Sequence, residues 1–195
     1  MRVVAGELRG RRLSSVPGRE TRPTSDRARA GVFDWLRERV SGARVLDLFA
    51  GTGALGIEAL SRGAREAVFV ERSRSALRVL RGNLTALGLE GRARVVERDL
   101  ARGLGPLAAK GSGFQLVFAD PPYEGDWLAR LVSCETLFRI LEPGAVVIAE
   151  RSARRPPAQP PRGGALELRG TKRYGETAFD WYERTGAAER GAAET

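Results

Sequence analysis

The sequence predicts an α/β fold with a mostly parallel, seven-stranded sheet, a C-terminal antiparallel hairpin and a small N-terminal β-hairpin extension. Between residues 44 and 149, short apolar runs alternate with amphipathic segments. This alternation is typical of a parallel sheet covered by helices on both faces. Two strand-like segments near the end of the chain flank Tyr174-Gly175-Glu176. A length of 195 residues suits one compact domain with a sizeable core.

The first part of the chain predicts a basic hairpin and then a helix. Residues 3–13 have the pattern of two short strands around Gly6-Glu7. Arg22-Pro23-Thr24 is expected to be extended and stiff, and residues 24–26 supply oxygens that can cap a helix. We therefore expect an extension at 1–23, a main domain at 24–185 and a flexible tail at 186–195. The apolar positions of the first helix recur at helical spacing: Ala28, Val32, Trp35, Leu36 and Val40.

The main domain predicts five strands before the terminal hairpin. These strands are 44–49, 67–70, 93–97, 114–119 and 145–149. The helices between them begin in the turn at 51–56 and end near Gly63, span 75–87 with Gly88 as the stop, and span 126–141 with Pro143-Gly144 as the stop. Residues 154–164 are rich in proline and glycine and predict an exposed loop, before hairpin strands at 165–171 and 177–182.

Composition limits the chemistry that the chain can perform. It contains no histidine, so the commonest general base and metal ligand is missing, and we expect no metal site. Cys134 is the single cysteine, so no internal disulfide can form, and we expect a buried thiol within a helix. No apolar run is long enough to cross a bilayer, and no signal peptide is evident, so we expect a cytoplasmic protein.

The charge distribution indicates an anionic partner. The net charge is +9, and residues 1–30 contain eight arginines against three carboxylates. An arginine-rich composition can also reflect a GC-rich genome. The concentration of charge in one short segment favours a surface that binds a phosphate backbone.

A glycine-rich turn follows the first predicted strand of the main domain. Residues 47–56 have the sequence Asp-Leu-Phe-Ala-Gly-Thr-Gly-Ala-Leu-Gly, which matches G-x-G-x-x-G between a strand and a helix. Glycines let the backbone turn sharply and approach a ligand closely. This Rossmann-like turn could hold a dinucleotide pyrophosphate or the amino-acid end of S-adenosylmethionine, and a purely structural turn is the alternative.

Two acidic residues end the next two predicted strands. Glu71, about 20 positions after the first glycine of the turn, can accept hydrogen bonds from ribose hydroxyls. Asp99 can accept from an adenine amino group, although it could also cap a turn. Both nucleotide-type cofactors would use these acids, so they do not distinguish the two.

The stretch Asp120-Pro121-Pro122-Tyr123 follows the fourth of these five strands and points to a particular chemistry. A carboxylate and a backbone carbonyl from the stiff prolyl turn can both accept hydrogen bonds from one NH₂ group. The nitrogen lone pair is then directed at an electrophilic methyl group. Tyr123 can stack on an extruded base, a contact worth about 1–3 kcal/mol.

Together these motifs resemble class I methyltransferases that act on amino groups. A longer set of motifs resembles the bacterial RsmD family, which methylates N2 of a guanine in 16S ribosomal RNA, of the guanine-966 type. The resemblance covers about residues 2–184, whereas the proline-rich loop matches no family feature that we can assign. The motifs that carry it are Arg2-Val3-Val4-Ala5-Gly6, Arg9-Gly10-Arg11-Arg12-Leu13, Arg22-Pro23-Thr24-Ser25-Asp26-Arg27 and the stretch from Asp47 to Gly63.

The resemblance implies a role for each motif. Asp120, Pro121, Pro122 and Tyr123 would form the catalytic motif that holds the guanine. S-adenosylmethionine, with S-adenosylhomocysteine as product, would be bound by Thr24, Asp47, Phe49, Ala50, Gly51, Thr52, Gly53, Glu71, Arg72, Asp99, Leu100 and Asp120. RNA phosphates would be bound by Arg2, Arg9, Arg11, Arg12, Arg22 and Arg27. The implied partner is 16S rRNA in the 30S subunit or an assembly intermediate. Apart from the resemblance, we expect no membrane partner and take a monomer as the simplest oligomeric state.

Other functions remain open at this stage. A dinucleotide-dependent oxidoreductase shares the glycine turn and Glu71 but would need a hydride-transfer site. A DNA adenine-N6 or protein glutamine methyltransferase could use the same Asp-Pro-Pro-Tyr pocket. An RNA-binding module without activity would explain the arginines but leave that motif without a purpose.

Overall fold

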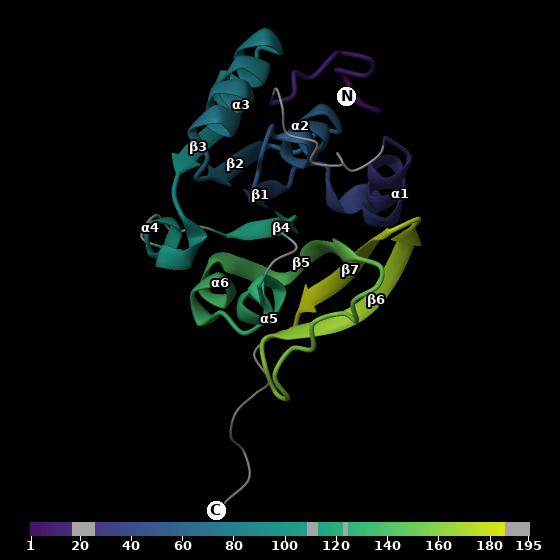
Figure 1. Cartoon of the computed structure of the whole chain (residues 1–195), viewed down its shortest axis with the longest axis vertical. Helices are drawn as coiled ribbons and strands as arrows, with labels where there is room; N and C mark the ends of the chain where they lie inside the picture. The colour runs from purple at the N-terminus through teal and green to yellow at the C-terminus, as the bar shows by residue number, and fades with distance from the viewer. Residues whose placement is uncertain (17–25, 109–112, 123–124, 186–195) are drawn as a thin grey trace, which may run out of the picture.

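A seven-stranded sheet forms the centre of the molecule in the computed structural model, which describes residues 1–16, 26–108, 113–122 and 125–185 (Figure 1). The strand order is β3-β2-β1-β4-β5-β7-β6, with β1 to β5 parallel and β7 antiparallel to both neighbours. This confirms the predicted fold class. The strands are β1 Arg44–Leu48, β2 Glu66–Glu71, β3 Ala93–Glu97, β4 Phe114–Ala119, β5 Leu141–Ser152, β6 Leu166–Tyr174 and β7 Thr177–Arg184.

Helices cover both faces of the sheet, as the runs of buried apolar residues in the strands require. Phe33, Ile57 and Leu80 from α1, α2 and α3 join one core, and Val132 and Ile140 from α5 and α6 join the other. Within the described parts of the chain, no helix is both long and apolar enough to cross a bilayer. The helices are α1 Asp26–Leu36, α2 Ala54–Ser61, α3 Arg74–Ala86, α4 Gly105–Ala108, α5 Trp127–Val132 and α6 Glu135–Ile140, with 3₁₀ turns Arg37–Arg39, Glu90–Arg92 and Leu100–Arg102.

The strand register gathers the predicted site residues at one edge of the sheet. Leu48 of β1 pairs with Val70 of β2 and with Ala119 of β4. The residues that follow these three positions are Phe49, Glu71 and Asp120. Because the strands are parallel, all three lie at the same carboxyl-terminal edge, which is where ligands bind in open α/β sheets.

The predicted helix at 126–141 is wrong in two respects. It is two short helices, because Ser133 and Cys134 leave helical geometry, and Cys134 is half-buried between them rather than buried within a helix. Pro143-Gly144 does not end a helix but lies inside β5. Phe114 pairs with Leu141 and Leu116 with Val146, so extra residues bulge from β5 at this point. A bulge accommodates proline, which cannot donate to the ladder, and Gly144 there has a φ of 74°.

The N-terminal hairpin is shorter than the sequence pattern predicts. It has one antiparallel bridge, between Arg2 and Arg12, supported by the amide of Val3 donating to the carbonyl of Arg11 at 2.9 Å. The amides of Gly10 and Leu13 also donate across the hairpin, to Val3 and Met1, whereas the amides of residues 4, 5, 7 and 8 bind Glu58 or Ser61 of α2. Gly6 is essential to this approach, since its φ is 85° and a Cβ there would lie 1.9 Å from the Ser61 carbonyl oxygen.

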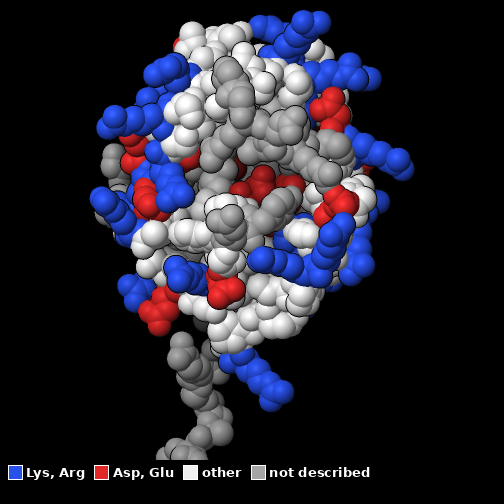
Figure 2. Space-filling view, in the orientation of Figure 1, with Lys and Arg blue, Asp and Glu red and all other residues white. Residues whose placement is uncertain are grey.

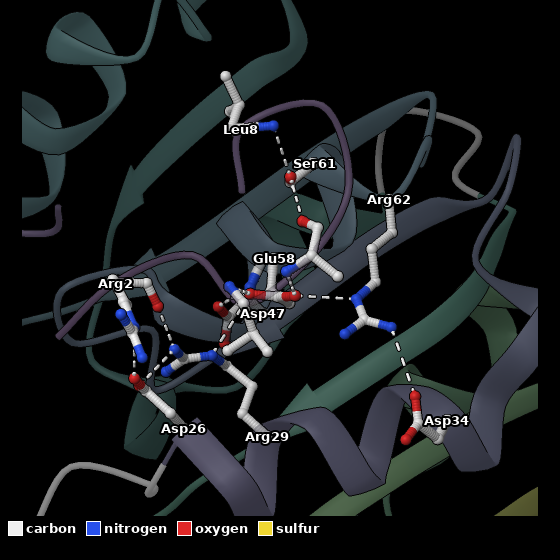
Figure 3. A network of polar contacts seen from close by, with 12 residues as sticks. Arg2, Leu8, Asp26, Arg29, Asp34, Asp47, Glu58, Ser61 and Arg62 are labelled. Atoms are coloured by element: carbon white, nitrogen blue, oxygen red, sulfur yellow. Dashed lines mark hydrogen bonds and ion pairs between the residues drawn. The ribbon is translucent and has the colours of Figure 1, made fainter. Parts of the chain in front are cut away.

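A buried network of polar contacts fixes residues 2–8 to α1 and α2 (Figure 3). Glu58, which is 1% exposed, accepts from the amides of Val4 and Ala5 at 2.8 and 3.0 Å. Its carboxylate also pairs with the fully buried Arg29 at 3.5 Å and with Arg62 at 2.8 Å. Arg29 in turn donates to the carbonyl oxygen of Arg2. The described part of the extension therefore packs as an integral part of the main core.

We expect Glu58→Ala to lower the free energy of unfolding by about 3–5 kcal/mol, because it leaves the buried amides of Val4 and Ala5 without their acceptor and leaves the buried Arg29 charge with only the partly exposed Asp26 as an ion-pair partner. Urea unfolding measures this change. Glu135→Ala is the matched control, since Glu135 forms an exposed ion pair with Arg139 at 3.6 Å and should cost about 0–1 kcal/mol. Equal losses in the two variants would contradict the structural role of the network.

Candidate active site at the carboxyl edge of the sheet

The glycine turn between β1 and α2 has the backbone geometry that the sequence predicts. Gly51 and Gly53 have φ values of 55° and 86°, a region that favours glycine. A Cβ on Gly53 would lie 2.4 Å from Leu80, so this position also has no room for a side chain. Phe49 adopts a φ of 59°, which is strained for an aromatic residue, and such strain is concentrated at functional sites.

Asp47 stabilises the glycine turn with its buried carboxyl group. It is 2% exposed, and its Oδ2 accepts from the amide of Gly56 at 2.9 Å, which anchors the first turn of α2. Burial, together with the nearby charges of Asp120 and Glu71, raises the pKa of Asp47 to about 7, although the hydrogen bond from Gly56 opposes the shift. Because its carboxyl group is buried, Asp47 would affect a ligand through its charge and through the turn that it supports rather than by direct contact.

Glu71 connects β2 to the glycine turn. Its Oε2 accepts from the amide of Gly51 at 2.8 Å, and its Oε1 accepts from the amides of Arg72 and Ser73 at 2.7 Å. The sequence pattern places Glu71 at the strand end but gives no sign of these three contacts, because backbone amides of an irregular turn leave no mark on residue type. Glu71 thus orders the turn and stays half-buried at its surface.

Asp99 both caps a turn and forms an ion pair. Its Oδ1 accepts from the amide of Ala101 at 2.9 Å, and its Oδ2 lies 3.1 Å from Arg72. The hydrogen bond from Ala101, with Arg72 as a further contributor, holds the pKa of Asp99 below its usual value. Leu100, the next residue, is half-buried. Arg72 therefore contacts both strand-end acids: its amide donates to Glu71, and its guanidinium pairs with Asp99.

Asp120 directly follows β4, close enough to Asp47 for its charge to contribute to the raised pKa of Asp47. It is accessible on one side, yet the surrounding protein atoms desolvate its carboxyl group and raise its pKa to about 6. Figure 2, in the orientation of Figure 1, shows acidic side chains gathered in a hollow near the centre of the face that is drawn. Arginine and lysine side chains lie around the margin of that face. Pro121 is buried and Pro122 exposed, while Tyr123 lies outside the described residues.

Two contacts at this edge involve residues that the sequence patterns do not single out. Phe49 packs edge-on against Trp127 of α5, with ring centroids 5.3 Å apart. Asn83 of α3 donates to the carbonyl oxygens of Thr52 and Ser14 and accepts from the amide of Ser14. Asn83 therefore ties the glycine turn to the N-terminal segment. The one sequence signal is an asparagine at an apolar-face position of a predicted helix.

The predicted RNA-binding arginines differ in how far they are already engaged. Arg2 pairs with Asp26 at 3.3 Å, and Arg11 donates to the carbonyl of Ala86 at 2.8 Å. Arg9 and Arg12 are exposed, and neither forms a hydrogen bond or ion pair through its side chain with another described residue. Arg27 is also exposed, and the remaining predicted positions, Arg22 and Thr24, lie outside the described residues.

The amino-acid sequence is similar to a known protein family and to named rRNA methyltransferases. A family model described as Conserved hypothetical protein 95 matches residues 1–183. The chain belongs to this family. Ribosomal RNA small subunit methyltransferase D of Escherichia coli is 40% identical over 133 residues, which cover 68% of this chain and 65% of that protein. YlbH of Bacillus subtilis, a candidate rRNA methyltransferase, is 37% identical over 186 residues, which cover 95% of this chain and 100% of that protein. The resemblance to the RsmD family is thereby confirmed.

Solved structures place the family in the methyltransferase fold. The Escherichia coli protein yhhF, a methyltransferase candidate, has a TM-score of 0.79 and 34% identity, covering 96% of this chain and 99% of that one. A methyltransferase candidate crystallised with S-adenosylhomocysteine, SMU.776, has a TM-score of 0.65 and 13% identity, covering 81% of this chain and 48% of that one. The second likeness shows the fold alone.

Proposed function

We propose that this chain is an S-adenosylmethionine-dependent rRNA methyltransferase that modifies the exocyclic N2 of a guanine in 16S rRNA, of the guanine-966 type. The observation that carries the proposal is the position of Asp120-Pro121-Pro122 at the carboxyl edge of the sheet, beside the glycine turn and two further carboxylates. The substrate would be the 30S subunit or an assembly intermediate in the cytoplasm, and the enzyme would act as a monomer.

The site suits a cationic cofactor. Asp47, Glu71 and Asp120 lie close enough for the charges of the last two to raise the pKa of the first. A positive group among them would relieve that repulsion. S-adenosylmethionine supplies an electrophilic methyl group on a positively charged sulfur. The turn containing Ala50, Thr52 and its glycines would hold the methionine end.

The strand-end acids would hold the rest of the cofactor. Glu71 would accept from the ribose hydroxyls, because a carboxylate has about four acceptor positions and three are taken by amides. Asp99 and Leu100 would contact the adenine, and Arg72 would orient Asp99. Phe49 and Thr24 would complete the cofactor pocket.

Asp120 would act on the guanine amino group. Its ionised carboxylate and a backbone carbonyl of the Pro121-Pro122 turn would accept hydrogen bonds from the two N–H groups and direct the nitrogen lone pair toward the methyl group. No strong base is required beforehand, since the nitrogen becomes acidic once methylated and can then lose a proton. Asp120, with a pKa raised to about 6, is a suitable acceptor for that proton. Tyr123 would stack on the base.

The direct test supplies the protein with S-adenosylmethionine carrying a labelled methyl group and small ribosomal subunits from cells that lack the activity. After digestion, we expect label in N2-methylguanosine. Asp120→Ala should lower the rate by about 10²–10³ while cofactor binding survives, because the variant has no oriented acceptor at this position. Asp34→Ala is the control, since Asp34 is an exposed aspartate on α1 that lies 3.8 Å from Arg62.

Three outcomes would contradict the proposal. Full activity in Asp120→Ala would exclude the proposed mechanism. No label in rRNA, with label in adenine or in glutamine when DNA or protein is supplied instead of subunits, would keep the methyltransferase but change the substrate. Failure to bind S-adenosylmethionine at all would exclude the methyltransferase.

The unengaged arginines of the N-terminal segment should contact RNA phosphates. We expect the double variant Arg9→Ala, Arg12→Ala to weaken RNA binding and to reduce the slope of log K against log salt by about 0.7–0.9 for each phosphate that these arginines neutralise. The control is Arg139→Ala, Arg169→Ala, which removes the same charge from arginines that pair with Glu135 and Glu167. Identical slopes in the two double variants would mean that Arg9 and Arg12 do not contact RNA.

A further inference from the structure

A cavity adjoins the Asp-Pro-Pro motif, and none of the residues lining it is among those proposed to hold the cofactor, although Trp127 in its wall packs against Phe49. Its volume is about 410 Å³, within the range of small-molecule sites. It lies between the start of α5, the end of β5 and the proline-rich loop at 154–164. The residues that form most of its apolar wall are Pro121, Pro122, Trp127, Leu128, Pro156 and Pro157.

The cavity and the carboxylates lie on different sides of the sheet edge. Leu131 and Val132 of α5 pack in the core beneath one face, whereas Phe118 of β4, two residues before Asp120, packs in the core of the other face. In Figure 1, α5 and α6 lie on the opposite side of β4 from α2. Asp120 does not line the cavity, although Pro121 and Pro122 do. The prolyl turn is thus a wall between the two spaces.

The proline-rich loop is held in place by buried polar contacts. Tyr182, buried in the core, donates its hydroxyl to the carbonyl of Ala158 at 2.8 Å. Arg151 is 4% exposed, pairs with the fully buried Asp180 at 2.6 Å and donates to the carbonyl of Arg155. Proline fixes φ at each position it occupies. The loop is therefore restricted both by its proline φ angles and by the hydrogen bonds to its carbonyl groups. Such a loop is preformed and loses little conformational entropy when a ligand binds.

One arginine packs on the Trp127 ring and another lines the cavity. The guanidinium of Arg130 lies 5.7 Å from the centre of the Trp127 ring. Arg155 lines the cavity, is exposed, and has no side-chain hydrogen bond or ion pair with any other described residue. Two acids, Asp126 and the buried Glu150, also line it. An aromatic side chain beside an arginine available for a phosphate is the combination that binds single-stranded nucleic acid.

We propose that this cavity binds a nucleotide adjacent to the target guanine in the RNA, with its base against Trp127 and the prolines and its phosphate near Arg155. The inference rests on the proposed function, because it assumes an RNA substrate held at Asp120. A target base can be extruded only if its neighbours unstack or are held elsewhere. A preformed site across the prolyl turn would hold one such neighbour and fix the register of the strand.

The test uses a synthetic RNA stem-loop that contains the target guanine, with an abasic site placed in turn on each side of it. At one of the two positions we expect the abasic site to raise the Kd of the natural chain about 5- to 150-fold, the worth of one stacked base. Trp127→Ala should raise the Kd for the intact RNA by a similar factor and show little further weakening with the abasic RNA. Trp127→Phe should restore most of the binding.

Arg155→Ala provides a second measurement that does not depend on the packing of Trp127. We expect it to lower kcat/KM for methyl transfer to small ribosomal subunits and to reduce the salt slope by about 0.7, which corresponds to one single-strand phosphate. Arg139→Ala, at an exposed arginine of α6, is the control. Two results would exclude nucleotide binding in the cavity, provided that the unsubstituted protein methylates subunits. One is an abasic site that weakens binding as much in Trp127→Ala as in the unsubstituted protein. The other is an Arg155→Ala variant whose kcat/KM and salt slope equal those of the control. If the natural chain does not methylate subunits, the proposed function fails instead.

Discussion

The desolvation of carboxyl groups at the carboxyl edge of the sheet is the constraint on which the rest of the structure depends. The register of β1, β2 and β4 brings Asp47, Glu71 and Asp120 to one edge, where desolvation raises the pKa of the buried Asp47 to about 7 and that of the more accessible Asp120 to about 6. Such an arrangement costs stability unless hydrogen bonds compensate for it. The amides of Gly56 and Gly51 supply part of this compensation, so the glycine turn and the acids stabilise one another.

The distribution of charge on the surface suits two kinds of ligand of opposite charge. The hollow is acidic and suits a positively charged cofactor, whereas the surface around it is rich in arginine, in a chain of net charge +9, and suits a polyanion (Figure 2). The N-terminal segment serves both features. It carries exposed arginines, and its Ser14 is bound by the asparagine that also holds Thr52 of the glycine turn. Glu58 and Arg29 keep this segment in register with α2.

Much of the fold can be predicted from local sequence, because periodicity and glycine positions report directly on strands and turns. The ranges 93–97 and 114–119 match β3 and β4 as the structure has them. The bulge around Pro143 could not be predicted, since it depends on how β5 pairs with β4, and no glycine or proline marks the break between α5 and α6 at Ser133 and Cys134. Asp120 and Glu71 could be named because they follow strands. The hydrogen bonds of Glu58, Glu71 and Asn83 could not be predicted, because these side chains accept from backbone amides, and Asn83 also donates to backbone carbonyls, whose positions only the tertiary structure determines.

The most direct measurement compares the affinities of S-adenosylmethionine and S-adenosylhomocysteine between pH 5 and pH 8. The two ligands differ by the methyl group and the positive charge on sulfur. Carboxyls with raised pKa values are protonated at the acidic end and ionise as the pH rises through about 6 and 7. We therefore expect the preference for S-adenosylmethionine to increase with pH, and to increase less in Asp120→Asn. A preference that does not change with pH would contradict the view that these carboxylates form the binding site of a cationic cofactor.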